Sequence, residues 1–294
     1  MMGEERRQFS MWPEALIVLQ SIAYGFGDPI SKIAFEVTPV YTMMSVRYSI
    51  AFVVACLLFG KRIRETLKTV PVKAWLVPGI SIGMTYVLNN VALNLTDATS
   101  VAFLRSLSVV LTPLFGFLIY KHRYNLRVVV IQIAVIPGLY LLCVRGGLSG
   151  FGAGEAVTLA AAAMMACALV SSNKYLDTVD PIALTALMAG CSAVIAIVGC
   201  FIFEGGPNLS ETTPTAWLII LYLALACTLL GYMMQNLALT RISARSVSLI
   251  QSLCPVMTAI FSYFILGEKL STAGIAGALI IITCVAAATV LSGE

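Results

Sequence analysis

The chain has 294 residues, of which 60% are hydrophobic and 11% charged, and its mean hydropathy is +0.95. Soluble domains average about 25% charged residues, so this composition excludes an ordinary soluble domain and indicates a chain that is mostly immersed in lipid. The net charge of +4 does not indicate nucleic-acid binding, because the basic residues flank apolar segments, where membrane topology explains them first.

Apolar runs of about 20 residues, the length that a helix needs to cross a bilayer, recur along the whole chain. They are continuously apolar and do not alternate as barrel strands would, so we predict helices. The first run lacks a cleavage site of small residues, so we expect it to stay in the membrane rather than to act as a signal peptide. The ten predicted spans cover residues 13–35, 39–59, 73–94, 98–119, 126–143, 154–175, 181–203, 214–238, 244–266 and 272–291.

The eight cysteines lie inside apolar runs and form no CxxC pair, and the single histidine, His122, lies in a basic loop. Disulfides and a zinc site are therefore not expected, and we interpret the thiols as small residues in the helix packing. We expect no cofactor.

The second half of the chain repeats part of the first. Residues 86–120 align with residues 232–266 without a gap, and roughly a third of the aligned positions are identical, which indicates a duplicated unit. At this offset Arg105 is aligned with Gln251, so one copy carries a charge where the other does not. Identical aligned pairs include Tyr86 and Tyr232, Asn90 and Asn236, Ser106 and Ser252, and Thr112 and Thr258.

The basic residues predict the orientation of the two copies. With the N-terminus inside, thirteen of the eighteen fall on the cytoplasmic side and three (Lys32, Arg145 and Lys269) on the other, as the positive-inside rule requires. The loop after the second span is basic and its counterpart is not, so the second copy enters the membrane inverted. We therefore predict an all-α integral membrane protein of ten transmembrane helices, built as two inverted five-helix repeats (residues 1–147 and 148–294) with both termini cytoplasmic.

Short motifs add a resemblance to a known family. The motif residues are Lys32, Pro39 and Arg47 in the first half, Lys174 and Pro181 at the matching spacing in the second, Cys254-Pro255-Val256, and Gly267-Glu268-Lys269-Leu270 before the last span. Together with the repeat and the topology, they resemble the EamA-like branch of the drug/metabolite transporter superfamily over nearly the whole chain. The resemblance implies a ten-helix secondary transporter of small solutes, with export more frequent than import.

Three ionisable residues, Asp28, Arg47 and Arg105, lie inside predicted spans, where a charge costs about 2.5–3.5 kcal/mol on insertion scales. A rise of about 1.5 Å per residue places all three at a similar depth in the same half of the bilayer. Asp28 could pair with Arg105, with Arg47, or with Lys32 one turn further along. For Arg47 we favour such a packing role. For Arg105 we favour substrate binding, because its counterpart Gln251 shows that the fold does not require a charge there.

The first span carries a polar face. Gln20, Tyr24, Asp28 and Ser31 recur at three- to four-residue spacing and therefore share one side of a helix. Two glycines and a proline within residues 25–29 weaken the helix at this level. A bent or broken helix here is typical of a transporter substrate site, and a packed proline kink is the equal alternative.

Further polar residues lie in or at the ends of other spans. Tyr86, Asn89 and Asn90 in the third span are mirrored in the eighth by Tyr232, Gln235 and Asn236. These amides and phenols need partners, either another helix or a ligand, and both alternatives stay open. Lys32 at the end of the first span, and Asn173 and Lys174 at the end of the sixth, are either snorkelling end residues or parts of alternating gates.

The sequence thus favours a secondary transporter that moves a small anionic or zwitterionic metabolite, with amino acids as the leading class, by alternating access around a central cavity. Arg105 would bind a carboxylate, and Asp28 would hold an amine or carry a coupling proton. The predicted substrate-binding residues are Tyr24, Asp28, Tyr86, Asn89, Asn90, Arg105, Tyr232, Gln235, Asn236 and Gln251. The predicted gating or coupling residues are Asp28, Lys32, Asn173 and Lys174.

Two alternatives are weaker. A membrane enzyme acting on a lipid or isoprenoid substrate would need an acid/base or metal constellation, and the sequence has one histidine and no pair of deep carboxylates. A transporter of organic cations would use Asp28 and leave Arg105 unexplained. No nucleotide-binding P-loop is present, so the chain alone is not expected to use ATP. We expect a monomer or homodimer in a prokaryotic inner membrane, with a solute, lipid and a coupling proton as its partners.

Overall fold

The computed structural model describes residues 12–95, 101, 104–120, 126–143, 152–267 and 271–292, and the regular structure in these ranges is helical. The first half contains α1 (Trp12–Phe35), α2 (Val40–Thr69), α3 (Lys73–Leu95), α5 (Ser108–Tyr120) and α6 (Leu126–Cys143). The second half contains α7 (Ala153–Tyr175), α8 (Pro181–Phe203), α9 (Pro214–Tyr222), η1 (Leu223–Leu230), α10 (Gly231–Leu239), α11 (Ala244–Ile250), η2 (Gln251–Leu253), α12 (Cys254–Leu266) and α13 (Thr272–Ser292). The predicted boundary between residues 147 and 148 lies outside the described residues.

The helices have the surface of a membrane protein. Six helical stretches in the described ranges are long and apolar enough to cross a bilayer. On α8 the side chains of Phe201, Ile202 and Phe203 are 61–69% exposed. Soluble monomers rarely expose contiguous apolar side chains of this size, whereas lipid tails accommodate them. The prediction of an all-α integral membrane protein is confirmed at this level.

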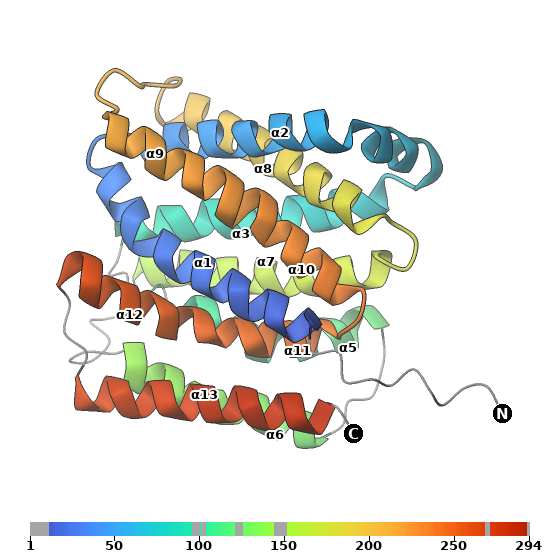
Figure 1. Cartoon of the computed structure of the whole chain (residues 1–294), viewed down its shortest axis with the longest axis vertical. Helices are drawn as coiled ribbons and strands as arrows, with labels where there is room; N and C mark the ends of the chain where they lie inside the picture. Colours follow the sequence, from blue (N-terminus) through green and yellow to red (C-terminus); the bar gives the residue numbers. More distant parts are fainter. Residues whose placement is uncertain are drawn as a thin grey trace.

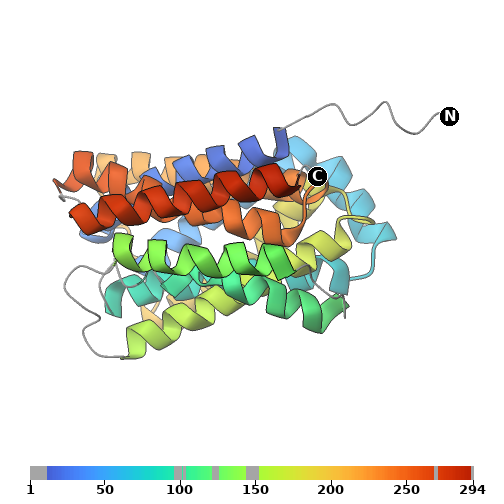
Figure 2. The ribbon, with the colours of Figure 1, turned by 90° about the horizontal axis from the view of Figure 1, so that it is seen from below.

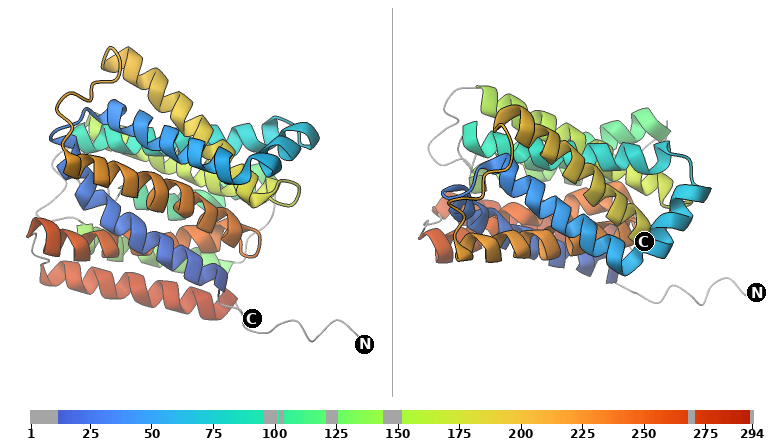
Figure 3. Two further views of the ribbon diagram at one scale, coloured as in Figure 1. Left: turned by 45° about the horizontal axis from the view of Figure 1, so that its top comes forward. Right: turned by 90° about the horizontal axis from the view of Figure 1, so that it is seen from above.

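The helices run back and forth along one common direction (Figure 1). α3 packs against α7 and α8, and α8 in turn lies beside α2 (Figure 3). α6 and α13 lie side by side at the opposite edge (Figure 2). The start of α1 and the end of α13 are at the same end of the bundle (Figure 1).

α2 is longer than predicted. The apolar run ends near residue 59, as expected, and Phe59 has the non-helical backbone angles of a kink (φ −125°, ψ 18°). The helix nevertheless continues to Thr69, because the next residues are mostly good helix formers, and Ile63 and Thr66 are buried. The predicted end at residue 59 was therefore wrong, and the extension is a basic segment.

α2 and α8 are tied together at both ends. The Glu204 carboxylate, at the end of α8, accepts hydrogen bonds from the backbone N–H groups of Tyr41 (2.8 Å) and Thr42 (2.7 Å) and from the Thr42 hydroxyl (2.8 Å). At the other end, Asp180 caps the start of α8 and forms an ion pair with Arg62 of α2 at 3.2 Å. The C-terminal part of each helix thus holds the N-terminal end of the other.

α1 is one helix that continues through Pro29, so of the two forms considered, bent or broken, it is not broken at this level. The glycines on α1 serve close packing instead. A Cβ atom on Gly25 would overlap Met257 of α12, and a Cβ atom on Gly27 would lie 2.9 Å from the Cys227 Sγ atom of η1. Small residues at these positions let α1 approach both neighbours.

Two stretches of the second half depart from α-helical geometry. The η1 stretch between α9 and α10 is π-helical, and the Thr228 hydroxyl donates to the carbonyl of Leu223, five residues earlier, at 3.0 Å. The η2 stretch is a single 3₁₀ turn that contains Gln251. Nothing in the sequence analysis predicted them. π-helical stretches are rare and occur frequently at functional sites.

Candidate functional site

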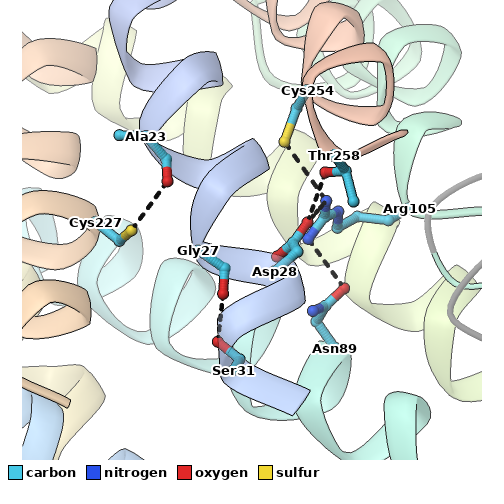
Figure 4. A network of polar contacts seen from close by, with 9 residues as sticks. All are labelled: Ala23, Gly27, Asp28, Ser31, Asn89, Arg105, Cys227, Cys254 and Thr258. Atoms are coloured by element: carbon cyan, nitrogen blue, oxygen red, sulfur yellow. Dashed lines mark hydrogen bonds and ion pairs between the residues drawn. The ribbon is translucent and has the colours of Figure 1, made fainter. Parts of the chain in front are cut away.

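An ion pair between Asp28 and Arg105 lies at the centre of the polar residues (Figure 4). Asp28 comes from α1, and Arg105 from the helical residues 104–106 that precede α5. The Arg105 Nη2 and Asp28 Oδ2 atoms are 3.0 Å apart, and the side chains are only 16% and 29% exposed. Of the three partners considered for Asp28, the structure therefore pairs it with Arg105.

Neighbouring helices fix the geometry of this pair (Figure 4). The Thr258 hydroxyl of α12 donates to Asp28 Oδ2 at 3.2 Å. The Arg105 Nη1 atom donates to the Asn89 side-chain oxygen of α3 at 3.4 Å, and its Nη2 atom lies 3.7 Å from the Cys254 Sγ atom. Sequence reasoning missed Cys254 and Thr258 as site residues. Their four-residue spacing, which places both on one face of the ninth predicted span, was the available signal.

A cluster of glutamines lies on the side of α1 toward its N-terminus. The Gln251 amide donates to the side-chain oxygens of Gln20 and Gln235, both at 2.9 Å, and the Gln20 amide donates to the Gly231 carbonyl at 2.8 Å. Gln251 is therefore held by hydrogen bonds to neutral amides, whereas its repeat counterpart Arg105 forms an ion pair. Gln235 is fully buried and accepts its hydrogen bond from the neighbouring 3₁₀ turn.

Three tyrosines extend the site across the bundle. The rings of Tyr24 and Tyr86 meet edge to face with centroids 5.9 Å apart, and Tyr86 stacks on Tyr232 at 5.8 Å. The Gln20 amide donates to the Tyr24 hydroxyl at 3.3 Å. Tyr86 and Tyr232, which the repeat aligns, are thus direct neighbours.

Two cavities adjoin these residues. The first cavity, about 520 Å³ with its opening, is lined by Ser21, Tyr24, Thr85, Tyr86, Arg105, Ser106, Ser108, Met165, Ser248, Gln251, Ser252 and Cys254. The second cavity, about 400 Å³, is lined by Tyr24, Gly27, Asp28, Ser31, Arg47, Tyr86, Asn89, Asn90, Leu93, Arg105, Leu223 and Cys227. Tyr24, Tyr86 and Arg105 border both. On α1 and α3, the residues that line the first cavity precede in the chain those that line the second. Tyr24, Tyr86 and Arg105 therefore lie between the two cavities.

The remaining predicted residues are placed as follows. Asn90 lines the second cavity and donates to the Tyr86 carbonyl of its own helix at 2.7 Å. Asn236 is fully buried and donates to the Thr185 hydroxyl of α8 at 3.0 Å, which is a contact between helices. Neither Asn236 nor Tyr232 lines either of the two cavities.

The predicted gating residues lie at helix ends. Asn173 donates to the Leu239 carbonyl at 2.9 Å and so joins the ends of α7 and α10. Lys174 is exposed, with its Nζ atom 5.8 Å from the centroid of the Tyr175 ring, and Lys32 is half-buried in the last turn of α1. The ends of α1 and α7 that carry the two lysines lie at opposite ends of the bundle (Figure 1).

Comparison with known proteins adds the family. The sequence profile of the EamA-like transporter family matches residues 11–144 and 152–290. An uncharacterized transporter of Archaeoglobus fulgidus is 28% identical over 269 residues, which cover 92% of this chain and 83% of that protein. The uncharacterized transporter YyaM of Bacillus subtilis is 23% identical over 281 residues, which cover 93% of this chain and 88% of that protein.

A solved crystal structure matches with a TM-score of 0.76 at 18% identity, covering 95% of this chain and 96% of that chain, which shows a shared fold. The family and the named relatives are transporters and not enzymes, so the alternative of a membrane enzyme is set aside. The chain is a multi-pass integral membrane protein with a small-molecule solute as its partner, and it belongs to the EamA-like transporter family.

Proposed function

We propose that this EamA-type transporter moves a small anionic or zwitterionic metabolite, with amino acids as the leading class, by alternating access between the first and the second cavity. The observation that carries the proposal is the Asp28–Arg105 pair, whose arginine borders both cavities. A charged pair inside an apolar bundle is costly and marks solute or ion pathways in membrane proteins.

The chemistry of the pair suits a zwitterion. The planar guanidinium of Arg105 can donate two parallel hydrogen bonds to a carboxylate, and Asp28 can accept from an ammonium group. A zwitterion that enters between them replaces each charge by an equal one, so neither side chain is left unpaired in a dry site. In the absence of an amine, Asp28 is also the candidate to carry a coupling proton.

The architecture proposed for this cycle is that of ten transmembrane helices in two inverted repeats, residues 1–147 and 148–294. Two observations support it. The family profile matches each half separately, and the packing of α1 against α12 has its counterpart in the packing of α5 against α7. Lys32 with Asp28, and Asn173 with Lys174, would then belong to gates at opposite ends of the bundle.

The orientation and direction of the cycle are also part of the proposal. The distribution of basic residues favours a cytoplasmic location for both termini in a prokaryotic inner membrane. The start of α1 and the end of α13 lie at the same end of the bundle, which supports a location of both termini on one side (Figure 1). The family resemblance favours export. The protein would work as a monomer or a homodimer.

The test is transport by the purified protein in proteoliposomes, against a panel of amino acids, organic acids and organic cations. Arg105→Gln should abolish saturable transport of the best solute while the variant purifies as a monodisperse protein. Arg64→Gln is the matched control, since Arg64 lies at an exposed position of the same basic segment of α2, and it should transport normally. Unchanged kinetics of Arg105→Gln, or transport limited to cations, would contradict the proposed site.

A further inference from the structure

Among the described residues, Arg47 of α2 is a buried cation without a carboxylate partner. The side chain is 6% exposed, and the ion pairs among the described residues join Arg62 to Asp180 and Arg105 to Asp28, not Arg47 to an acid. Its Nε atom donates to the Thr228 hydroxyl at 2.9 Å, and the guanidinium carbon lies 5.2 Å from the centroid of the Tyr48 ring. These contacts offset only part of the cost of burying a charge. Of the residues considered as partners of Asp28, Arg105 forms the ion pair, and Arg47 contacts η1 instead.

The π-helical stretch η1 holds Thr228 against this arginine. The Thr228 hydroxyl donates its only proton to the Leu223 carbonyl at 3.0 Å and accepts from Arg47 Nε with a lone pair. The guanidinium is thus fixed through its Nε atom. Among the described residues, no group accepts a hydrogen bond from the four N–H bonds of the two Nη atoms, so these atoms can donate to both oxygens of a carboxylate.

The second cavity is the space beside this guanidinium. Its lining includes Arg47 together with Leu223 and Cys227 of η1, and Cys227 also contacts the Ala23 carbonyl of α1 at 3.4 Å (Figure 4).

The charge balance of the second cavity points to an anion. Asp28 and Arg105 neutralise each other, and Arg47 adds one positive charge that no described residue compensates. We propose that Arg47 binds a carboxylate of the solute, and that the second cavity thereby selects solutes of net charge −1 over their neutral analogues. An acidic amino acid complements the three groups, with its ammonium on Asp28 and one carboxylate on each arginine. This inference rests on the proposed function and deepens it, because it names the solute class.

Binding to the purified protein, measured by isothermal titration calorimetry, tests the selectivity without transport. The probes are two matched pairs, glutamate with glutamine and phosphoserine with serine. We expect the wild-type protein to bind glutamate at least about tenfold more tightly than glutamine, the range of one hydrogen-bonded charge contact. Arg47→Gln should bring this ratio to about one by weakening glutamate, with the affinity for glutamine unchanged. Arg64→Gln, at an exposed position of α2, is the matched control and should retain the ratio.

A second variant separates a binding effect from misfolding. Arg47→Lys keeps the charge and loses the fork, so it should retain a preference for glutamate with a lower affinity. Equal affinities for glutamate and glutamine in the wild-type protein, a preference for phosphoserine alone, or a preference that survives Arg47→Gln would each overturn the proposal. If Arg47→Gln removes only the acid preference and Arg105→Gln leaves transport intact, the assignment of Arg105 fails and that of Arg47 stands. If instead the preference for glutamate survives Arg47→Gln and Arg105→Gln abolishes transport, the assignment of Arg47 fails and that of Arg105 stands.

Discussion

The Asp28–Arg105 pair makes a quantitative prediction about coupled stability. With charge centres about 4 Å apart and an effective dielectric constant of about 20, the attraction is about 4 kcal/mol. Desolvation of the two partly exposed groups (29% and 16%) offsets part of that gain. Asp28→Asn leaves Arg105 without its counter-charge, and Arg105→Gln leaves Asp28 with only the Thr258 hydroxyl. Each single change should therefore lower the free energy of unfolding by about 2–3 kcal/mol.

The double variant Asp28→Asn/Arg105→Gln removes both charges and should lose about 1 kcal/mol or less. The coupling energy between the two sites is then about 3 kcal/mol or more, measured by reversible unfolding of the four proteins in mixed micelles. Additive losses, with the double variant as unstable as the sum of the single ones, would refute the reasoning that the two charges stabilise the fold only as a pair.

Two further predictions concern packing. Glu204→Gln should lower the free energy of unfolding, measured by thermal unfolding, by about 1–2 kcal/mol, because a neutral amide accepts hydrogen bonds from the start of α2 more weakly than a carboxylate does. Glu211→Gln, at an exposed position, is the control and should have no effect in the same assay. Gly231→Ala would place a Cβ atom 2.7 Å from the Tyr24 hydroxyl and so move the ring that borders both cavities. Gly231→Ala should reduce solute affinity and lower the free energy of unfolding by about 1–3 kcal/mol. Gly60→Ala, whose Cβ meets nothing within 4 Å, is the control and should reduce neither. Normal solute binding by Gly231→Ala would show that Tyr24 does not contact the solute.

Much of the helical architecture was readable in the sequence, because a bilayer imposes a minimum apolar length on every spanning helix. The apolar runs thus gave the helix ranges, and they failed at α2, where a polar segment of good helix formers continues past the membrane length. Asp28 and Arg105 could be identified as deep charges for a similar reason, since depth follows from helical rise. Their pairing could not, because depth says nothing about which helices are neighbours.

The arginines show where sequence reasoning ends. Arg105 was singled out because its repeat counterpart is neutral, whereas Arg47 was read as a packing residue. The structure reverses their electrostatic situations, since Asp28 neutralises Arg105 and leaves Arg47 alone. The π-helical turn that holds Thr228 against Arg47 has no composition signal, because its residues are ordinary apolar helix formers. Only packing reveals such a contact.

The contacts that join α2 to α8 are unequal, and this bears on the resting state of the transporter. At one end the half-buried Glu204 carboxylate holds a helix start with three hydrogen bonds. At the other, Arg62 and Asp180 are 53% and 35% exposed, and such a surface pair contributes at most about 1 kcal/mol. Separating the helices at the Arg62 end therefore requires less work, and a difference of about 1.4 kcal/mol is a tenfold bias in population. Without solute, α2 should separate from α8 at the Arg62 end more often than at the Glu204 end.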